Sequence, residues 1–262
     1  MTTVKESIKI MMEIQQKKNF FNFQKSLMRI SSSSEAGFTL IELSIALLVI
    51  GLILSGLMMK GAGLLESARL NKVLSQVEEI KTAVSRFQEQ FNALPGDYSE
   101  AKANIHDSLI DGNQNGTIEG DGLDPASEAG QFWVHLSARN LISDVGSPRT
   151  TQSAEGDGSQ THMNFGNGAP SAKIGGGFTV QNNPTSDMPG LWLVLGAKNG
   201  SLGNGALLTP LQAMQLDQKA DNGHPTTGNV RAISGSEKKC LTEQKTYNTK
   251  LDEPACVLYF KL

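Results

Sequence analysis

The sequence predicts an α+β protein, with one long N-terminal helix followed by a globular domain of short helices and strands. The first observation is an apolar run over residues 38–59 that continues as an amphipathic pattern to residue 91, with no proline before Pro95. The second is a set of short runs rich in β-branched and aromatic residues in the C-terminal half. These predicted strands are residues 177–180, 191–196 and 256–261.

The composition indicates an ordinary globular domain with extensions. The chain has 262 residues, of which 39% are hydrophobic and 6% aromatic, and 27 are glycines. Such a composition is typical of a modest core wrapped in many turns. The net charge is −3, and no run of basic residues is interleaved with aromatic ones. A nucleic-acid partner is therefore not predicted.

Residues 38–59 are long enough to cross a membrane as a helix. Glu42 is the only ionisable side chain between Phe38 and Met59, and Lys60 ends the run. A bilayer crossing takes about 20 apolar residues. Positive charge before the segment is expected to stay in the cytoplasm, so the C-terminal part of the chain should lie outside it. That charge comes from Lys5, Lys9, Lys17, Lys18, Lys25 and Arg29, against Glu6, Glu13 and Glu35.

Glu42 separates the interpretations of this segment. A secretory signal peptide cleaved near "GAG" at 61–63, or a plain signal anchor, would each account for the apolar run. Neither accounts for an acid inside it, because an unpaired carboxylate disfavours insertion and no basic side chain lies within a helical turn. A cut between Gly37 and Phe38 would place a new α-amine one turn from Glu42, where the first N–H groups of the helix also favour an acid. In an assembly, the amine could equally come from a neighbouring subunit.

The stretch "GFTLIELSIALLVIGLI" at 37–53 resembles the N-terminal signature of type IV prepilins and type II secretion pseudopilins. The resemblance implies that a dedicated membrane peptidase cuts after Gly37 and methylates the new N-terminus at Phe38. It also implies that Glu42 pairs with a terminal amine during assembly. One departure is the leader, which is long for the family. A start at Met28 would shorten it to "MRISSSSEAG".

The same resemblance implies a domain organisation and a set of partners. Residues 1–37 would be a cytoplasmic leader, residues 38–91 the long helix, and residues 92–262 an extracytoplasmic pilin-like domain whose antiparallel sheet packs against the helix. The implied partners are the prepilin peptidase and methylase, other pilin or pseudopilin subunits, and an inner-membrane assembly platform with its ATPase. The implied location is the inner membrane, as a single-pass protein with a periplasmic C-terminal domain, or an extracellular filament.

Two cysteines, Cys240 and Cys256, lie near the C-terminus. Outside the cytosol they could close a short loop as a disulfide, which would stabilise the fold by roughly 3 kcal/mol. Two unrelated reduced thiols are the alternative. The position of the pair matches the C-terminal disulfide that often closes a variable loop in the family that the chain resembles, so the resemblance supports the disulfide.

The second half of the long helix carries one apolar stripe at alternating spacings of three and four residues. Its members are Leu70, Val73, Val77, Ile80, Val84, Phe87 and Phe91. The stripe alone is compatible with a two-stranded coiled coil or, as the resemblance implies, with packing on a sheet. Pro95 and Gly96 are expected to stop the helix.

Two short helices are predicted between residues 97 and 140 from their capping residues. The sequence "DYSE" at 97–100 places an N-cap acid three residues before a glutamate. Asp124 and Pro125 offer a cap and a first-turn proline for a helix over residues 126–140. The buried face of that second helix is expected to be Phe132, Trp133, Leu136 and Leu141.

A third short helix is predicted over residues 209–220, where Thr209 and Gln212 form a capping box and "DNG" ends the helix. Residues 143–170 are rich in Ser, Thr, Gly, Asp and Asn. They are predicted to form a long loop or insertion.

The loop "DGNQNGTIEGDG" at 111–122 is a candidate calcium site. Carboxylate and amide side chains alternate in its first half, and Gly116 allows a sharp turn, as in an EF-hand loop. The twelfth position is Gly122 instead of the bidentate glutamate, so other acids would have to complete the shell. The alternative is a polar loop without a ligand, because Asp, Asn and Gly are turn formers. The candidate ligands are Asp111, Asn113, Asn115 and Asp121, with Asp124 or Glu128 as further candidates.

No arrangement of residues in the sequence indicates an enzyme. The four histidines, His106, His135, His162 and His224, have no zinc-like spacing among themselves or with the cysteines. His135, on a predicted helix, is expected to be packed or at the surface. Asp217 and Asp221 lie one helical turn apart, where a solvated capping role is expected. No phosphate loop, nucleophile elbow or Ser/His pair stands out.

The leading hypothesis is therefore a structural subunit of a type IV pilus or a type II secretion pseudopilus, polymerised through its apolar helix after cleavage and methylation. Two alternatives stay open. One is a membrane-anchored extracytoplasmic binding module that never polymerises, and the other is a secreted domain released by ordinary signal peptidase near residue 63. The mature N-terminus separates the secreted domain from the other two, and co-purification with filaments separates the subunit from the binding module.

Overall fold

The computed structural model describes residues 39–143, 145 and 163–262, without the side chains of residues 54–64. The chain divides into two compact units, Met1–Lys60 and Gly61–Leu262, and each is described by itself. The predicted leader, residues 1–37, lies outside the described residues, as does Phe38.

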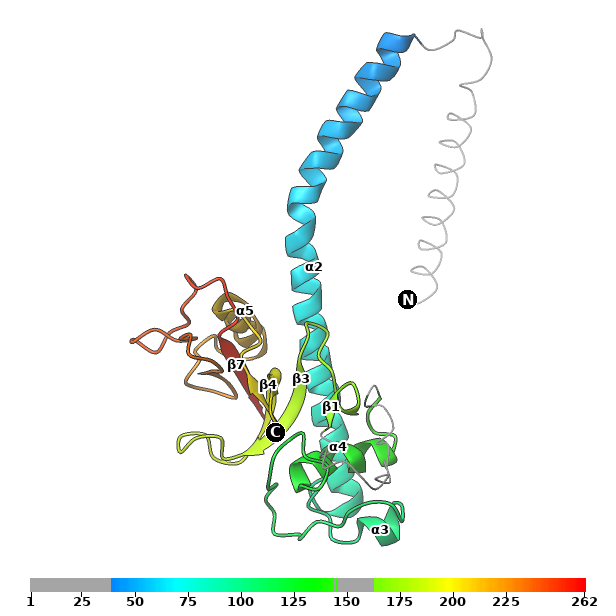
Figure 1. Ribbon diagram of the computed structural model, residues 1–262, viewed down its shortest axis with the longest axis vertical. Helices are drawn as coiled ribbons and strands as arrows, with labels where there is room; N and C mark the ends of the chain where they lie inside the picture. Colours follow the sequence, from blue (N-terminus) through cyan, green and yellow to red (C-terminus); the bar gives the residue numbers. More distant parts are fainter. Residues whose placement is uncertain (1–38, 144, 146–162) are drawn as a thin grey trace, which may run out of the picture. The chain divides into compact units, whose positions relative to one another are not determined.

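The long N-terminal helix, α2, runs from Leu40 to Phe91 (Figure 1). Its end agrees with the prediction, and the cause is local, because Asn92 adopts the left-handed conformation (φ 49°) in which helices commonly end. Among the described residues, no helix is both long and apolar enough to span a membrane. The predicted transmembrane segment, residues 38–59, includes Phe38 and the side chains of residues 54–59, which lie outside that description.

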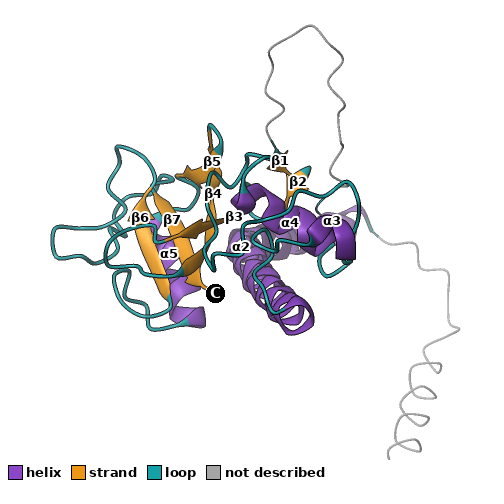
Figure 2. Ribbon diagram, turned by 90° about the horizontal axis from the view of Figure 1, so that it is seen from below, coloured by secondary structure: helices purple, strands orange, loops and turns teal. Residues whose placement is uncertain are grey.

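The second unit is built on an antiparallel sheet with the strand order β3-β4-β7-β6, and β5 pairs with β4 beside this path (Figure 2). The strands are β3 (Gly177–Asn182), β4 (Leu191–Asn199), β5 (Leu202–Gly205), β6 (Val230–Ser234) and β7 (Cys256–Lys261). The three predicted strands are β3, β4 and β7, which lie next to one another in the sheet. The predicted α+β class, a long helix with an antiparallel-sheet domain and short helices, is confirmed.

Some strands form where the sequence pattern does not predict them. β5 reads "LGNG", and its glycines and asparagine disfavour strands, so it forms as the return strand of a hairpin with β4. β6 is short and carries an arginine, and its register comes from pairing with β7. The predicted loop over residues 143–170 contains two further strands of two residues, β1 (Asn164–Phe165) and β2 (Gly168–Ala169).

Three short helices accompany the sheet, and the caps of two differ from the predicted ones. α3 (Ala101–Asn104) follows Glu100 at the N-cap position, so Asp97 is not its cap. α4 (Glu128–Ala138) begins after Ser127, whose hydroxyl accepts a hydrogen bond from the Gly130 N–H. The predicted start at Asp124 and Pro125 is therefore wrong by three residues. The Asp124 carboxylate instead accepts the Ala126 N–H at 2.9 Å within a local turn.

The third short helix, α5 (Pro210–Ala220), confirms its predicted signals. The Thr209 hydroxyl accepts the Gln212 N–H at 3.2 Å, and the Gln212 side chain accepts the Thr209 N–H at 2.9 Å. Pro210 occupies the first turn, where a missing N–H costs nothing. α5 packs against β6 and β7.

The apolar stripe of α2 lies in the main core of the second unit. All of its members are buried except Phe91, which is half-buried. They share one hydrophobic cluster with sheet residues such as Phe178, Leu193 and Leu258. The stripe is therefore filled within the chain, as the family resemblance implies, and not by a coiled-coil partner. A second cluster lies on the alternate positions of β4 and β7 and consists of Trp192, Val194, Val257 and Tyr259, together with Met188 from the loop before β4.

Candidate functional site

Glu42 lies in the first turn of α2, where it forms a reciprocal cap with Thr39. The Glu42 N–H donates to the Thr39 hydroxyl at 3.3 Å, and that hydroxyl donates to the Glu42 carboxylate, also at 3.3 Å. An acid in this turn is favoured by the unpaired N–H groups of the helix start. Glu42 is exposed. Gly37 and Phe38, the predicted cleavage and methylation residues, lie outside the described residues.

The first half of α2 is surrounded by exposed apolar side chains. Their exposed fractions range from 46% at Val49 to 89% at Leu40. The set consists of Leu40, Ile41, Leu43, Ile45, Leu47, Leu48, Val49, Ile50, Leu52 and Ile53. A contiguous apolar surface of this kind marks a site of contact with lipid or with other protein, because leaving it in water is unfavourable.

The predicted disulfide is present. Cys240 and Cys256 are bonded, their Cα atoms lie 4.9 Å apart, and both residues are fully buried. Cys256 is the first residue of β7, so the bond fixes the preceding loop to a central strand of the sheet.

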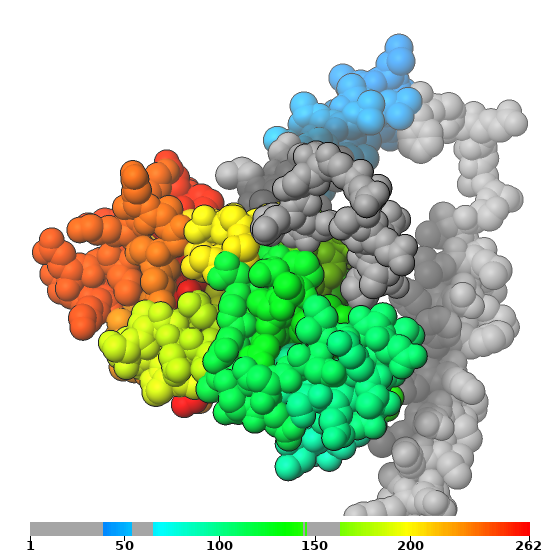
Figure 3. Space-filling view, turned by 60° about the horizontal axis from the view of Figure 1, so that its bottom comes forward, coloured from blue at the N-terminus to red at the C-terminus, as the bar shows by residue number. Residues whose placement is uncertain are grey.

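The candidate calcium loop lies on the surface coloured green in Figure 3, and its polar side chains are used in local hydrogen bonds. Asp111 accepts the Lys102 N–H at 2.8 Å. Asn113 accepts the Asn115 N–H at 2.9 Å, Asn115 accepts the Thr117 N–H at 2.8 Å, and Asp121 accepts the Ser201 hydroxyl. The bonds of Asn113 and Asn115 are local turns, which Asn side chains commonly form with the backbone two residues on. The bonds of Asp111 and Asp121 reach residues 9 and 80 positions away.

Two further carboxylates, one buried and one half-exposed, accept N–H groups of this loop. Asp97, only 1% exposed, accepts the Asn115 N–H at 3.0 Å and the Gly116 N–H at 2.9 Å. Glu128 accepts the Asn113 N–H at 3.0 Å and a second N–H from Glu119 at 3.2 Å. Burial raises the pKa of Glu128, and its two N–H donors oppose that rise.

The calcium hypothesis stays a prediction. Within residues 39–143, 145 and 163–262, no group of three or more His, Cys, Asp or Glu side chains is placed to hold a metal ion. The four candidate ligands point to separate backbone or side-chain donors instead of one centre. Calorimetric titration of the full chain with calcium tests the hypothesis directly.

His135 is packed, which is one of the two placements expected for it. It is fully buried, its Nδ1 atom accepts the Gly96 N–H at 3.0 Å, and its Nε2 atom lies 2.9 Å from the Ile110 carbonyl oxygen. Because Nδ1 accepts, the proton is on Nε2, which donates to Ile110. Burial lowers the pKa of His135, so the neutral ring is the folded form.

The two aspartates of α5 have different roles, and the solvated role expected of Asp217 is wrong. Asp217 is fully buried and accepts the Tyr247 hydroxyl at 2.7 Å and the Gly223 N–H at 3.1 Å. Asp221 caps the end of the helix, and its carboxylate accepts the Val230 N–H at the edge of β6.

Comparison with known proteins identifies the N-terminal segment. The family model described as the prokaryotic N-terminal methylation motif matches residues 32–58. The prepilin-type signature expected from the sequence is therefore confirmed over these residues. Among solved structures, the chain is similar to the major type IV pilin PilA1 from Clostridium difficile, with 12% identity, a TM-score of 0.34, and coverage of 75% of this chain and 95% of that one. No curated protein sequence matches significantly.

Proposed function

We propose, from the prokaryotic N-terminal methylation motif at residues 32–58, that this chain is a structural subunit of a type IV pilus or a type II secretion pseudopilus. In this proposal the prepilin peptidase cuts after Gly37 and methylates the new terminus at Phe38. The mature chain then enters a filament with other pilin-type subunits. An inner-membrane platform and its ATPase drive that step.

The apolar surface on the first half of α2 supports polymerisation through this helix. Side chains exposed all around the helix from Leu40 to Ile53 leave no face that water solvates well. Lipid would cover this surface before assembly, with the C-terminal domain in the periplasm, and other copies of the helix would cover it afterwards. The exchange of one apolar environment for another allows a subunit to leave the membrane without exposing the helix to water.

The single observation that carries the proposal beyond the motif is the placement of Glu42. Its carboxylate lies in the first helical turn, where a terminal amine created at Phe38 would come within reach of it in the same subunit or a neighbour. A carboxylate and an ammonium attract each other more strongly in an apolar environment than in water. Glu42 would therefore set the depth at which a new subunit joins the growing end.

The test compares Glu42→Gln with Glu42→Ala in the full chain, co-expressed with the prepilin peptidase and the assembly machinery. Glutamine keeps the ability to cap the helix start, so Glu42→Gln removes only the charge. Both variants should be inserted, cut and methylated like the wild type, and both should be depleted from purified filaments. Normal incorporation of Glu42→Gln would show that the charge has no role in assembly.

A further inference from the structure

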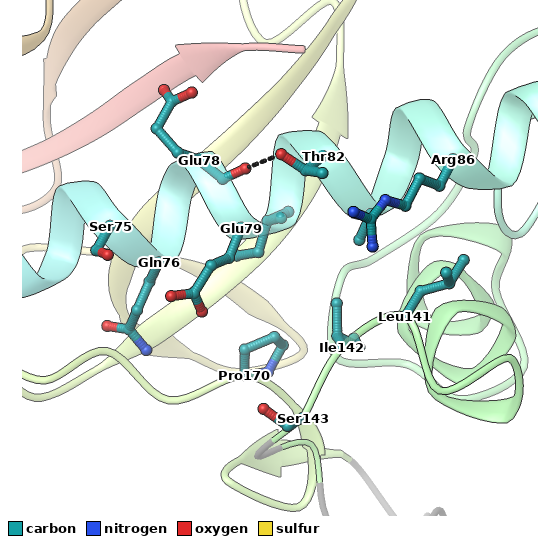
Figure 4. A pocket seen from close by; sticks show the side chains of 12 residues that line it. Ser75, Gln76, Glu78, Glu79, Thr82, Arg86, Leu141, Ile142, Ser143 and Pro170 are labelled. Atoms are coloured by element: carbon teal, nitrogen blue, oxygen red, sulfur yellow. Dashed lines mark hydrogen bonds between the residues drawn. The ribbon is translucent and has the colours of Figure 1, made fainter.

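Two exposed features of the second unit lie away from the helix start, a groove along α2 and the turn between β4 and β5. The groove has a volume of about 450 Å³ (Figure 4). Its lining mixes charged side chains such as Glu79 and Arg86 with apolar ones such as Ile142, and this mixture selects no single class of ligand. The turn has a more specific chemistry, because it contains an Asn–Gly pair at residues 199 and 200.

An Asn–Gly pair can change covalently without an enzyme, because the backbone nitrogen of the glycine can attack the side-chain Cγ of the asparagine before it. Glycine has no Cβ to hinder that approach. The sequence contains five such pairs, and all of them lie in described residues. They are Asn115–Gly116, Asn167–Gly168, Asn199–Gly200, Asn204–Gly205 and Asn222–Gly223. The fold therefore decides which pair reacts in the native chain.

Buried carboxylates hold the glycine nitrogen of two pairs. The Gly116 N–H donates to Asp97 at 2.9 Å, and the Gly223 N–H donates to Asp217 at 3.1 Å. Both aspartates are almost completely buried. An attack by either nitrogen must first break this hydrogen bond, which requires a local opening of the fold.

Two more pairs are protected by strands. Gly168 belongs to β2 and is buried, and a Cβ built on it would lie 2.7 Å from the side chain of Met163. Gly205 belongs to β5, is buried, and pairs with Ala197 of β4. Reaction at these two pairs likewise requires an opening of the fold.

The pair Asn199–Gly200 has none of these protections. Gly200 begins the two-residue turn of the β4–β5 hairpin (Figure 2), and its φ of 60° is typical of the first position of a type II′ turn. Both residues are exposed. Among residues 39–143, 145 and 163–262, no acceptor is bonded to the Gly200 N–H. The Asn199 side chain has one contact, an exposed hydrogen bond of 3.1 Å from its Nδ2 to Asn204.

The backbone at Asn199 can also rotate at little cost. Asn199 is the last residue of β4, and its pair with Leu202 is separated from the next pair of the hairpin by an irregularity of register. Rotation of Asn199 toward the geometry of attack therefore opens only the end of the hairpin, which is the part of a ladder that opens most readily.

We propose that Asn199 is a site of spontaneous covalent modification in the folded chain. The Gly200 nitrogen forms a bond to Cγ of Asn199, and the bond from Cγ to Nδ2 breaks. The proton of the Gly200 nitrogen passes through solvent to Nδ2, which leaves as ammonia. Water then opens the resulting succinimide and gives aspartate or isoaspartate, depending on which carbonyl it attacks. The net change replaces the amide NH2 by an oxygen and adds one negative charge, and it does not depend on the proposed function.

The isoaspartate product affects a neighbouring segment, because the turn holds that segment in place. The Leu123 N–H donates to the Ser201 carbonyl oxygen at 2.9 Å, and the Ser201 hydroxyl donates to Asp121. Isoaspartate places an extra methylene in the main chain directly before the turn and so displaces Ser201. Modification at Asn199 therefore loosens residues 121–123, whereas the aspartate product keeps the main chain and the contact.

The first experiment measures the rate at each pair. The full chain, purified in detergent, is incubated in mildly alkaline buffer, once folded and once in urea, and its peptides are mapped by mass spectrometry. Digestion in heavy-oxygen water marks any modification that occurs after the incubation. In the folded chain, Asn199 should react at least roughly tenfold faster than the other four asparagines, because their reaction requires an opening of the fold. In urea this difference should disappear. Asn199→Gln, which disfavours ring closure, should remove the fast site and leave the other four rates unchanged.

The second experiment measures hydrogen exchange at the Leu123 N–H. Exchange should be faster in the incubated wild type, in proportion to its isoaspartate content. It should be unchanged in Asn199→Gln after the same incubation and in freshly prepared Asn199→Asp.

Each part of the proposal can be overturned by one of these results. Equal rates at the five pairs of the folded chain, or a faster rate at another pair, would overturn the assignment of Asn199. Unchanged exchange at Leu123 in a chain that contains isoaspartate at position 199 would overturn the link to residues 121–123. Neither result bears on the proposed filament function.

Discussion

The Tyr247 hydroxyl donates a hydrogen bond of 2.7 Å to the Asp217 carboxylate, and both residues are buried. Asp217 lies on α5, and Tyr247 lies in the loop that the Cys240–Cys256 disulfide closes, so this bond joins the loop to the helix. Burial raises the pKa of Asp217, against the opposing effect of the hydroxyl and the Gly223 N–H. Burial also raises the pKa of Tyr247, which stays protonated as the donor.

Asp217→Asn is expected to increase the stability of the folded chain at neutral pH. Because the pKa of Asp217 is higher in the folded than in the unfolded state, the folded state binds more protons and is favoured at low pH. This gain in stability is lost as the pH rises through the native pKa, where the buried carboxylate becomes charged. Asparagine removes the charge and can keep both contacts, with its Oδ1 accepting the Gly223 N–H and its NH2 group donating to the Tyr247 oxygen. Urea unfolding of the full chain in detergent between about pH 4 and pH 7 measures the effect.

Tyr247→Phe is the matched control for that measurement. It removes the donor and leaves the buried carboxylate with one partner fewer, which should lower the free energy of unfolding by about 1–3 kcal/mol. If Asp217→Asn keeps the pH dependence of the wild type, the carboxylate is not the titrating group.

Acid should destabilise the chain through His135. Burial lowers the pKa of His135, so stability is present above the unfolded pKa of about 6.5 and is lost as the pH falls below that value. A proton on Nδ1 would also remove the acceptor of the Gly96 N–H. NMR titration of the His135 ring should give a midpoint below the ordinary value. A His135 midpoint above the ordinary value would contradict the buried, neutral assignment.

Reduction of the Cys240–Cys256 disulfide should lower the free energy of unfolding by about 3 kcal/mol, the loop-closure value for a loop of about this size. The two cysteines are 16 positions apart in the sequence. Unfolding of the full chain with and without a phosphine reductant measures the difference. The double variant Cys240→Ala, Cys256→Ala should be insensitive to the reductant. Equal stability of oxidised and reduced wild type would mean that the loop adds nothing to the fold.

Phe87→Ala tests whether the apolar stripe of α2 packs within the chain. Phe87 is fully buried, with ring centres 4.6 Å from Phe91 and 6.3 Å from Tyr98. Its truncation should cost about 3–5 kcal/mol, as for other buried aromatic residues. The loss should not depend on protein concentration, whereas a coiled-coil stripe would give a concentration-dependent loss. Gln90→Ala, an exposed change one turn away, is the control and should be nearly neutral.

Elements with local signals could be predicted from the sequence. The end of α2 before Pro95, the capping box of Thr209 and Gln212, and the three strands rich in apolar residues all depend on residues close together in the chain. The signature around Glu42 is likewise contiguous, so the candidate site at the helix start was accessible without a structure.

Features that depend on distant partners could not be predicted. Asp97 has the sequence context of an N-cap, but the N–H groups that it accepts come from Asn115 and Gly116, which are 18 and 19 positions away. The partners of His135 are 39 and 25 positions away. The residues of β5 have low strand propensity, and the strand forms because its backbone pairs with β4 in an antiparallel arrangement. The Asp217–Tyr247 bond depends on how the disulfide loop folds over α5.

The most direct test of the central claim is the mass of the mature N-terminus. The full chain is expressed with its cognate prepilin peptidase, and intact-mass and N-terminal peptide mass spectrometry are applied to the product. A terminus at N-methyl-Phe38 is the predicted result and would place the chain in the pilin pathway. An uncut chain, or a terminus just beyond Gly63, would contradict the account and return the protein to the signal-anchor or secreted interpretation.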